Sequence, residues 1–137
     1  MKDKLNFYIN GQWVESDSKE RIEIINPANE ELIGHVTSGT KEDINKAVSA
    51  ASDAFQTYQF SSKEDRIEIL KNIITEYENR YDDLVQVITE EMGAPTWLSQ
   101  KAQASTGIKN LHETLDALKE YEFEKKEGDY TLIREPI

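Results

Sequence analysis

The chain has 137 residues, enough for one domain of ordinary size, but its apolar share of 37% is below the ~45–50% typical of globular domains and its charged share is 31%. Its formal net charge of −11 repels phosphate backbones and anionic lipid surfaces, so nucleic acid and membrane partners are not expected. The absence of cysteine excludes a disulfide, a thiolate metal site and a cysteine nucleophile within these residues.

Residues 1–39 are predicted to form β-hairpins. Their start is too short and too polar for a signal peptide or a membrane-spanning helix, so a cytoplasmic protein is expected. Asn10-Gly11 separates two strand-like runs and is a strong two-residue hairpin signal. A second pair of strands, Arg21–Ile25 and Leu32–Val36, flanks a turn that contains Asn26-Pro27.

Residues 40–122 are predicted to form helices, because the apolar period changes there from two to about 3.6. Three main helices are expected. The first begins near Thr40, whose spacing to Asp43 is typical of a capping box. Its narrow apolar stripe consists mostly of small residues that let a helix lie close to a neighbour. The stripe contains Ile44, Ala47, Val48, Ala51 and Phe55.

The second predicted helix begins at Ser61 with Glu64, in the spacing of a capping box, and runs to Met92. Gly93 is placed where a left-handed C-terminal cap belongs, and Pro95 fits the first position of the next helix. The third helix is predicted from Thr96 to Tyr121. Its apolar face contains Leu98, Ala102, Ile108, Leu111, Leu115 and Leu118. A charged stretch then precedes a strand-like C-terminal segment, residues 129–137.

Residue chemistry alone reveals no active site. The sequence contains no GxGxxG, P-loop or HExxH motif. His35 and His112 are far apart, and each is interpreted as a surface histidine rather than a catalytic one. Trp13 and Trp97 could stack on a ligand, but a hairpin aromatic packed on a helix and an interhelical anchor are the favoured interpretations.

The order of five short motifs adds information that their spacing does not. In chain order they are FYINGQWVES, INPANEELIGHV, TKEDINKAVSAASDAF, the helix end TEEMGAP and the terminal REPI. As an ordered set they closely resemble the N-terminal part of the NAD(P)-dependent aldehyde dehydrogenase superfamily. The resemblance extends from Phe7 to Ile137. One departure is Ala94, where the family commonly has a lysine, and it leaves the subfamily open.

The resemblance implies an α/β aldehyde dehydrogenase fold for the parent protein, of which this mostly helical segment is the N-terminal part. The helices of residues 40–122 would pack on the cofactor-binding domain, and residues 129–137 would begin a bridging or oligomerisation strand. The terminal REPI is then expected to be a strand cut part-way. The oxyanion-site asparagine, the glycine-containing cofactor turn, the general-base glutamate and the nucleophilic cysteine would all lie beyond it.

The implied activity of the parent is oxidation of an aldehyde to a carboxylic acid with NAD or NADP. A cysteine thiolate adds to the aldehyde, hydride passes to the nicotinamide, and a glutamate-activated water hydrolyses the thioester. This segment would supply neither the cysteine nor the glutamate, and we expect it to be inactive and to bind no cofactor alone. The expected partners are the remainder of the dehydrogenase and, in a dimer or tetramer, other copies of the protein.

Two indirect sites follow from the resemblance by position. Glu91 matches a carboxylate that, with a backbone carbonyl near the Asn-Pro turn, forms a structural monovalent-cation site in many members. Here the carbonyl would belong to Ile24 or Ile25. Ala102 and Thr106 match positions that face the substrate tunnel. The alternative hypothesis is a stand-alone, non-catalytic helical interaction or oligomerisation module, which would need a partner over its apolar stripes.

Overall fold

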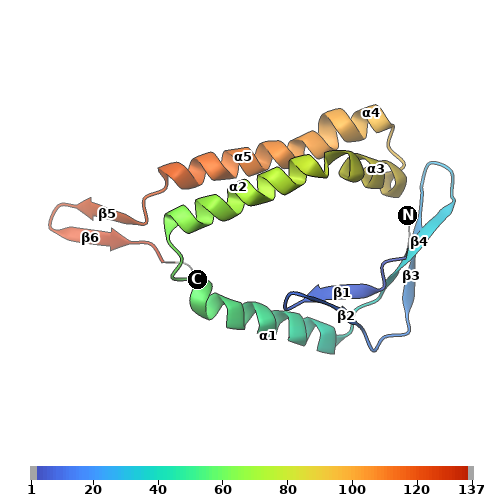
Figure 1. The fold of residues 1–137 in the computed structure, drawn as a ribbon, viewed down its shortest axis with the longest axis horizontal. Coiled ribbons are helices and arrows are strands. Elements are labelled where there is room, and N and C mark those ends of the chain that lie inside the picture. The colour runs from blue at the N-terminus through green and yellow to red at the C-terminus, as the bar shows by residue number, and fades with distance from the viewer. Residues whose placement is uncertain (1–2, 136–137) are drawn as a thin grey trace.

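The computed structural model describes residues 3–135 as helices and hairpins arranged around a central opening (Figure 1). The elements, in chain order, are β1 (Asn6–Ile9), β2 (Gln12–Glu15), β3 (Arg21–Ile25), β4 (Leu32–Thr37), α1 (Lys41–Tyr58), α2 (Lys63–Asn79), α3 (Tyr81–Met92), α4 (Thr96–Leu98), the π-helical segment η1 (Ser99–Ala104), α5 (Ser105–Glu120), β5 (Glu124–Glu127) and β6 (Tyr130–Ile133). The prediction of a mostly helical segment with N-terminal β-hairpins is confirmed.

The two N-terminal hairpins form at the predicted turns. Strand β1 pairs with β2 and β3 pairs with β4, each pair antiparallel. Asn10 and Gly11 have φ values of 52° and 75°, the left-handed geometry that a two-residue hairpin turn requires. The register of the second hairpin shifts between Ile24 and Ile25, which is a β-bulge just before the Asn-Pro turn.

A third hairpin was missed in part by the sequence prediction. The charged stretch was expected to be a solvated loop, but Glu124–Glu127 forms β5 and pairs with β6. Strand β5 has the sequence EKKE and is exposed along its whole length, so it lacks the apolar alternation that marks a strand in a sequence. Gly128, at φ 65°, makes the turn. Of the strand predicted over 129–137, Pro136 and Ile137 lie outside the described residues.

The second predicted helix is two helices. The chain leaves helical geometry at Arg80, with φ −110° and ψ 16°, and α2 ends there while α3 begins. Apolar positions continue at helical spacing across the break, so periodicity does not reveal it. The N-cap of α2 is Ser62, one residue later than predicted, and it forms a capping box with Asp65. The left-handed cap predicted at Gly93 is confirmed, at φ 63°. Pro95 is the N-cap of the next helix and not its first residue.

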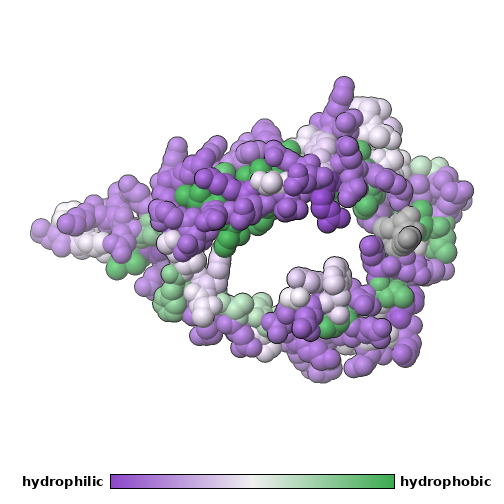
Figure 2. Space-filling model, viewed as in Figure 1, coloured by the Kyte–Doolittle hydropathy of each residue, from purple (hydrophilic) through white to green (hydrophobic). Residues whose placement is uncertain are grey.

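The core lies between two helical layers that run side by side in Figure 1, α2 with α3 and η1 with α5. Its buried apolar side chains come from both layers: Ile74, Val85, Ala104 and Leu115. The α1 helix and the β1–β2 hairpin lie across the opening, which Figure 2 shows passing between them and the helical layers. In α1 the buried residue is Asp43, whereas Ile44 and Val48 of the predicted stripe are 61% and 62% exposed.

Candidate functional site

The end of α3 contacts the turn between β3 and β4. A methyl group on Gly93 would lie 2.7 Å from the amide nitrogen of Ala28 and 3.0 Å from Cγ of Pro27. Glycine is therefore required at position 93 for two reasons: its backbone is left-handed, and the turn approaches it closely. The turn is held in shape by Asn26, whose side-chain oxygen accepts the amide of Ala28 at 2.9 Å.

The three residues predicted to form a cation site lie on the two sides of this contact. Glu91 is exposed in the last turn of α3, two residues before Gly93. Ile24 and Ile25 are the last two residues of β3, just before the turn. The register shift between them leaves Ile33 of β4 as the extra residue, because Ile24 pairs with Gly34 and Ile25 pairs with Leu32.

A π-helical segment interrupts the third predicted helix. Within η1, Ser99 and Ala104 are five residues apart, and both have 0% exposure. In a regular α-helix, residues five apart point in directions about 140° apart. Both side chains therefore face α3 because of the wider π-helical turn. Ala102 is exposed, so its predicted place on the apolar face with Leu98 and Leu115 is wrong for the described chain.

Side-chain hydroxyls satisfy the backbone carbonyls of η1. Four carbonyl oxygens accept such hydrogen bonds: Gln100 from Tyr81, Lys101 from Ser105 at 2.6 Å, Ala102 from Thr106 at 2.6 Å, and Ala104 from Tyr77 at 2.8 Å. The bonds of Ser105 and Thr106 to the carbonyls four residues earlier are of a kind common in helices, and the Ala102 carbonyl also accepts the amide of Ser105. The two tyrosines come from α2 and α3, whereas the serine and threonine belong to α5.

The predicted tunnel residues Ala102 and Thr106 are brought together on the outer side of this segment. Both are exposed, and the Thr106 hydroxyl is bonded to the Ala102 carbonyl. The exposed groups on this side are therefore the Ala102 methyl group and the Thr106 side chain, whose hydroxyl already donates to a backbone carbonyl. Such a surface offers room and an apolar contact more than a free hydrogen-bond donor.

The hydrogen-bonding roles of Tyr77 and Tyr81 were not predicted, because in the sequence both residues continue the apolar spacing of the second predicted helix. Their rings pack at a centroid separation of 6.4 Å while their hydroxyls reach η1. Gly107 makes room for Tyr77, since a methyl group there would lie 2.3 Å from the Tyr77 hydroxyl oxygen. The available signal was tyrosine, rather than leucine, at two successive positions of an apolar stripe, opposite a glycine inside a helix.

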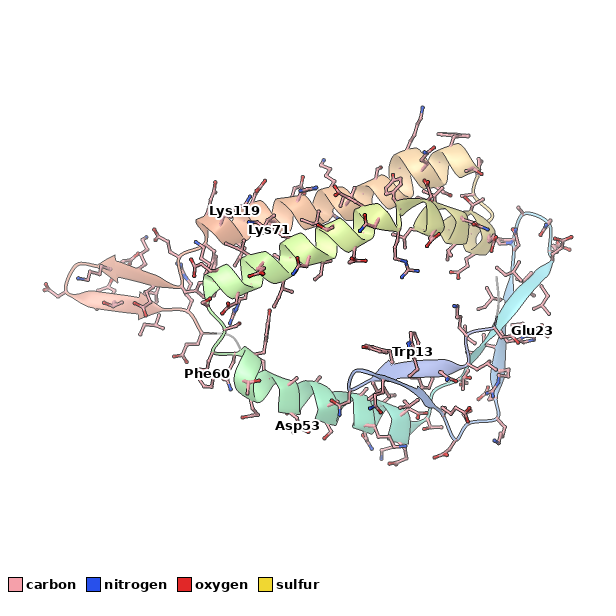
Figure 3. The ribbon with its side chains drawn as sticks, viewed as in Figure 1. Trp13, Glu23, Asp53, Phe60, Lys71 and Lys119 are labelled. Carbon is pink, nitrogen blue, oxygen red and sulfur yellow. The ribbon has the colours of Figure 1, made fainter. Side chains whose placement is uncertain are left out.

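The histidines and tryptophans do not form a common site. A ring nitrogen of His35 on β4 lies 3.1 Å from the Asp3 carboxylate, and His112 on α5 lies 3.9 Å from Glu78. Trp97 is 62% exposed, so the expected interhelical anchor is wrong for the described chain. Trp13 is 69% exposed and packs on Tyr8 at 5.2 Å rather than on a helix. Figure 3 shows Trp13 on the side of its hairpin that faces the opening.

Hydrogen bonds hold one carboxylate between α1 and the loop after β2. The Asp43 carboxylate accepts the Ser16 hydroxyl at 2.6 Å and both the amide and the hydroxyl of Thr40, at 2.9 and 2.8 Å. The Ser16 bond, followed by those from Thr40, lowers the pKa of Asp43 below its ordinary value. The capping box predicted for Thr40 and Asp43 is thereby confirmed, and it also ties α1 to the first hairpin.

Residues 3–135 hold no cluster of three or more histidine, cysteine or acidic side chains placed to bind a metal ion. Among the same residues no helix is long and apolar enough to cross a membrane. The sequence profile of the aldehyde dehydrogenase family matches residues 13–137. The chain belongs to the aldehyde dehydrogenase family.

Individual members of the family match over a limited part of their length. A putative aldehyde dehydrogenase of Staphylococcus aureus strain USA300 is 47% identical over all 137 residues, and the chain spans 29% of that protein. The crystal structure of an aldehyde dehydrogenase from Bartonella henselae superimposes with a TM-score of 0.90 at 34% identity, over 94% of this chain and 28% of that one.

The third comparison is with a ligand-bound structure. A mutant of aldehyde dehydrogenase C from Pseudomonas syringae, in complex with NAD+ and octanal, gives a TM-score of 0.86 at 34% identity. The match covers 90% of this chain and 25% of that one. The arrangement of hairpins, helices and opening described above is thus similar to one part of larger dehydrogenase structures.

Proposed function

We propose that this chain is the N-terminal structural segment of an NAD(P)-dependent aldehyde dehydrogenase and that it is inactive alone. The family match over residues 13–137 carries the proposal. The chain also contains no cysteine, the residue that in the proposed reaction supplies the nucleophilic thiolate. The aldehyde, the thiolate and the base would therefore meet outside these residues.

In the proposed reaction, a thiolate from the remainder of the protein would add to the aldehyde carbonyl, the adduct would lose hydride to become a thioester, and water would then release the carboxylic acid. NAD or NADP, when bound, would supply the hydride acceptor. The residues of this chain would have structural rather than catalytic roles. Glu91 and the carbonyl of Ile24 or Ile25 would hold a monovalent cation where α3 meets the Asn-Pro turn, and Ala102 and Thr106 would form one wall of the aldehyde channel.

The open architecture supports a role that depends on further polypeptide. Apolar side chains stay exposed in the hairpin and α1, among them Trp13, Ile44 and Val48. Figure 2 shows further apolar surface where the helical layers border the opening. Exposed apolar surfaces of this kind mark contact sites for other protein parts. The remainder of the dehydrogenase is the proposed occupant, and assembly into a dimer or tetramer is the further expectation for the whole protein.

The test compares two proteins for aldehyde-dependent reduction of NAD+ and NADP+, measured as absorbance of the reduced nicotinamide. One is the purified 137-residue chain. The other is the longer protein encoded by the reading frame that contains it. We expect turnover only with the longer protein. Turnover by the 137-residue chain alone would overturn the proposal.

The alternative, a non-catalytic interaction module, makes a different prediction for the same two samples. If the longer protein is inactive with every aldehyde, while the 137-residue chain forms a stable oligomer that unfolds cooperatively at low concentration, the module hypothesis is supported. Dye binding and weak, concentration-dependent folding of the isolated chain would instead agree with a segment that lacks its covering polypeptide.

A further inference from the structure

Helix α1 meets the helical layers at one corner, the loop of residues 59–62 that leads into α2. Among the described residues α1 packs along β1 and has no extended contact with either helical layer. Figure 1 shows α1 and α2 diverging from this loop, so that the opening lies in the angle between the two helices. The direction of α1 relative to the layers therefore depends on how the corner is held.

The Arg66 side chain, near the start of α2, binds the C-terminal end of α1. Its Nη2 donates to the carbonyl oxygen of Gln59 at 3.1 Å, and its Nε donates to the hydroxyl oxygen of Ser61 at 2.9 Å. That hydroxyl in turn donates to the carbonyl oxygen of Tyr58 at 2.7 Å. One guanidinium group of α2 thus holds two carbonyl groups at the end of α1, one directly and one through Ser61.

The charge of Arg66 favours this contact. The C-terminal end of a helix carries a partial negative charge, and a cation beside it is stabilising. Helix α1 has no basic residue in its own last turn. Arg66 supplies the cation from the next helix, so the interaction that completes α1 also ties it to α2.

Two aromatic rings from different elements pack on the same guanidinium. Its Cζ lies 5.4 Å from the ring centroid of Tyr58, the last residue of α1, and 5.4 Å from that of Phe123, which follows α5. A planar guanidinium stacks on aromatic faces while its N–H groups point to oxygen atoms in fixed directions, which the compact ammonium of lysine does not do. The ends of three helices therefore meet at the Arg66 side chain.

We propose that Arg66 is a positioning residue that fixes the direction of α1 relative to the helical layers and thereby sets the shape of the opening. The inference rests on the proposed function in one respect, because the remainder of the dehydrogenase is the polypeptide that would pack into the opening. A fixed corner presents the exposed apolar residues of α1, Ile44 and Val48, to that polypeptide in one geometry. Without the Arg66 contacts, α1 takes a range of directions.

The direction of α1 is measured by electron spin resonance, as the distance between two spin labels on the 137-residue chain. The chain contains no cysteine, so Asp53→Cys on α1 and Lys71→Cys on α2 provide its two labelling sites. Both positions are exposed, and Figure 3 shows them on the two helices that border the opening. We expect a narrow distance distribution with Arg66 and one at least about twofold wider with Arg66→Lys, which keeps the charge and loses the planar fork.

Lys63→Met is the matched control for loss of a basic side chain at the same end of α2. The Lys63 amino group donates to the carbonyl oxygens of Lys119 and Tyr121, at the end of α5, rather than to those of α1. This variant should leave the distance distribution between positions 53 and 71 unchanged.

A second label pair separates the direction of α1 from general loosening of the chain. Lys71→Cys and Lys109→Cys place both labels on the helical layers, at exposed positions of α2 and α5. Their distance distribution should be the same with Arg66 and with Arg66→Lys. If it widens as much as that of the first pair, Arg66 stabilises the chain as a whole and the positioning role is wrong.

Three further outcomes decide the role of Arg66. A broad distribution between positions 53 and 71 in the chain that keeps Arg66 overturns the proposal, and so does an unchanged distribution in Arg66→Lys. If Arg66→Lys loses its helical circular dichroism, Tyr58→Leu and Ser61→Ala each remove one contact of the same corner and should each widen the distribution. No change in either of them contradicts the proposal.

The consequence for assembly is tested in the longer protein that contains this chain. When α1 takes several directions, a smaller fraction of molecules is ready to receive the remaining polypeptide. After dilution from urea, propanal-dependent reduction of NAD+ or NADP+ should therefore recover at least about twofold more slowly in Arg66→Lys than in Lys63→Met. Equal recovery overturns the role in assembly. If the unmodified longer protein oxidises no aldehyde, the proposed function fails instead, and the label distances still test the corner.

Discussion

The helical layers and the N-terminal part of the chain are stabilised in different ways. Helices α2 and α3 pack on η1 and α5, and the buried apolar residues come from these elements. The hairpins and α1 have hydrogen-bonded turns, caps and strand ladders, but Ile44 and Val48 are exposed. The first part has a small core of its own. The second has well-formed local structure whose apolar faces are only partly covered within the described chain.

This difference shows that secondary structure can be fully specified where tertiary burial is not. Capping boxes and glycine turns need only near neighbours in the sequence. Burial of α1 needs a second surface, which the described residues provide only in part along β1. We therefore expect mutations to act through apolar packing in the helical layers and through local hydrogen bonds in the N-terminal part.

The largest effect is expected for Leu115→Ala. Leu115 is buried between the helical layers, and truncation of a buried leucine typically costs about 2–5 kcal/mol of unfolding free energy. Val48→Ala, on the exposed stripe of α1, should change the free energy of unfolding by about 0.5 kcal/mol or less. Urea unfolding of the 137-residue chain, followed by helical circular dichroism, measures both. Equal losses of unfolding free energy in the two variants would contradict the described difference between the helical layers and the N-terminal part.

The next effect concerns the contact between the two parts. Gly93→Ala adds a methyl group against the Ala28 backbone, and overpacking of this kind costs about 1–3 kcal/mol beyond the strain of the left-handed backbone. Gly128→Ala is the matched control, since its φ of 65° is close to the 63° of Gly93 but no atom lies within 4 Å of the added methyl.

Amide exchange should distinguish the two glycine variants. In Gly93→Ala we expect faster exchange in the Asn-Pro turn and in the last turn of α3, because the contact between them is lost. Gly128→Ala should affect only the β5–β6 hairpin. Similar losses of unfolding free energy in both variants would show that backbone strain alone matters and that the contact with Ala28 contributes nothing.

A smaller effect is expected for the helix caps. Thr40→Ala and Ser62→Ala each remove a capping hydroxyl, at a typical cost of about 1 kcal/mol. Thr40→Ala should also loosen the loop after β2, because Asp43 binds both Thr40 and Ser16. Ser62 has only a local partner, Asp65. Faster exchange of the Ser18 amide, which binds the Ser16 hydroxyl, in Thr40→Ala alone would confirm this difference.

The smallest effect is the response to acid. The pKa of Asp43 is lowered mainly by the Ser16 hydroxyl, and the pKa of Asp65 mainly by the Ser62 hydroxyl. Because each folded-state pKa lies below the ordinary value of 3.8, the stabilisation is fully present above that pH and is lost as the pH falls through the folded pKa.

A nuclear magnetic resonance titration of the two carboxylates checks the acid response. Protonation of Asp43 should release the loop after β2 from α1, whereas protonation of Asp65 should affect only the start of α2. Ser16→Ala should raise the pKa of Asp43 toward 3.8 and leave that of Asp65 unchanged. An unchanged pKa of Asp43 in this variant would contradict the assigned cause.

The predicted parts of the fold are those with local signals. The turn at Asn10-Gly11, the cap at Thr40 and the left-handed residue Gly93 each require a particular side chain, or none, at one position, and all are as predicted. The break at Arg80 and strand β5 were missed because neither changes the apolar pattern. The residues predicted for the cation and channel sites came from the family resemblance, and their roles stay predictions.

The sequence by itself determined the order and type of most elements and the family, because caps, turns and apolar periods act over a few residues. Only the tertiary structure decided the π-helical register of η1 and the hydrogen-bonding roles of Tyr77 and Tyr81. A π-helical turn gains its stability from donors on another helix and from burial of residues five apart. Those conditions exist only once α2 and α3 pack against it.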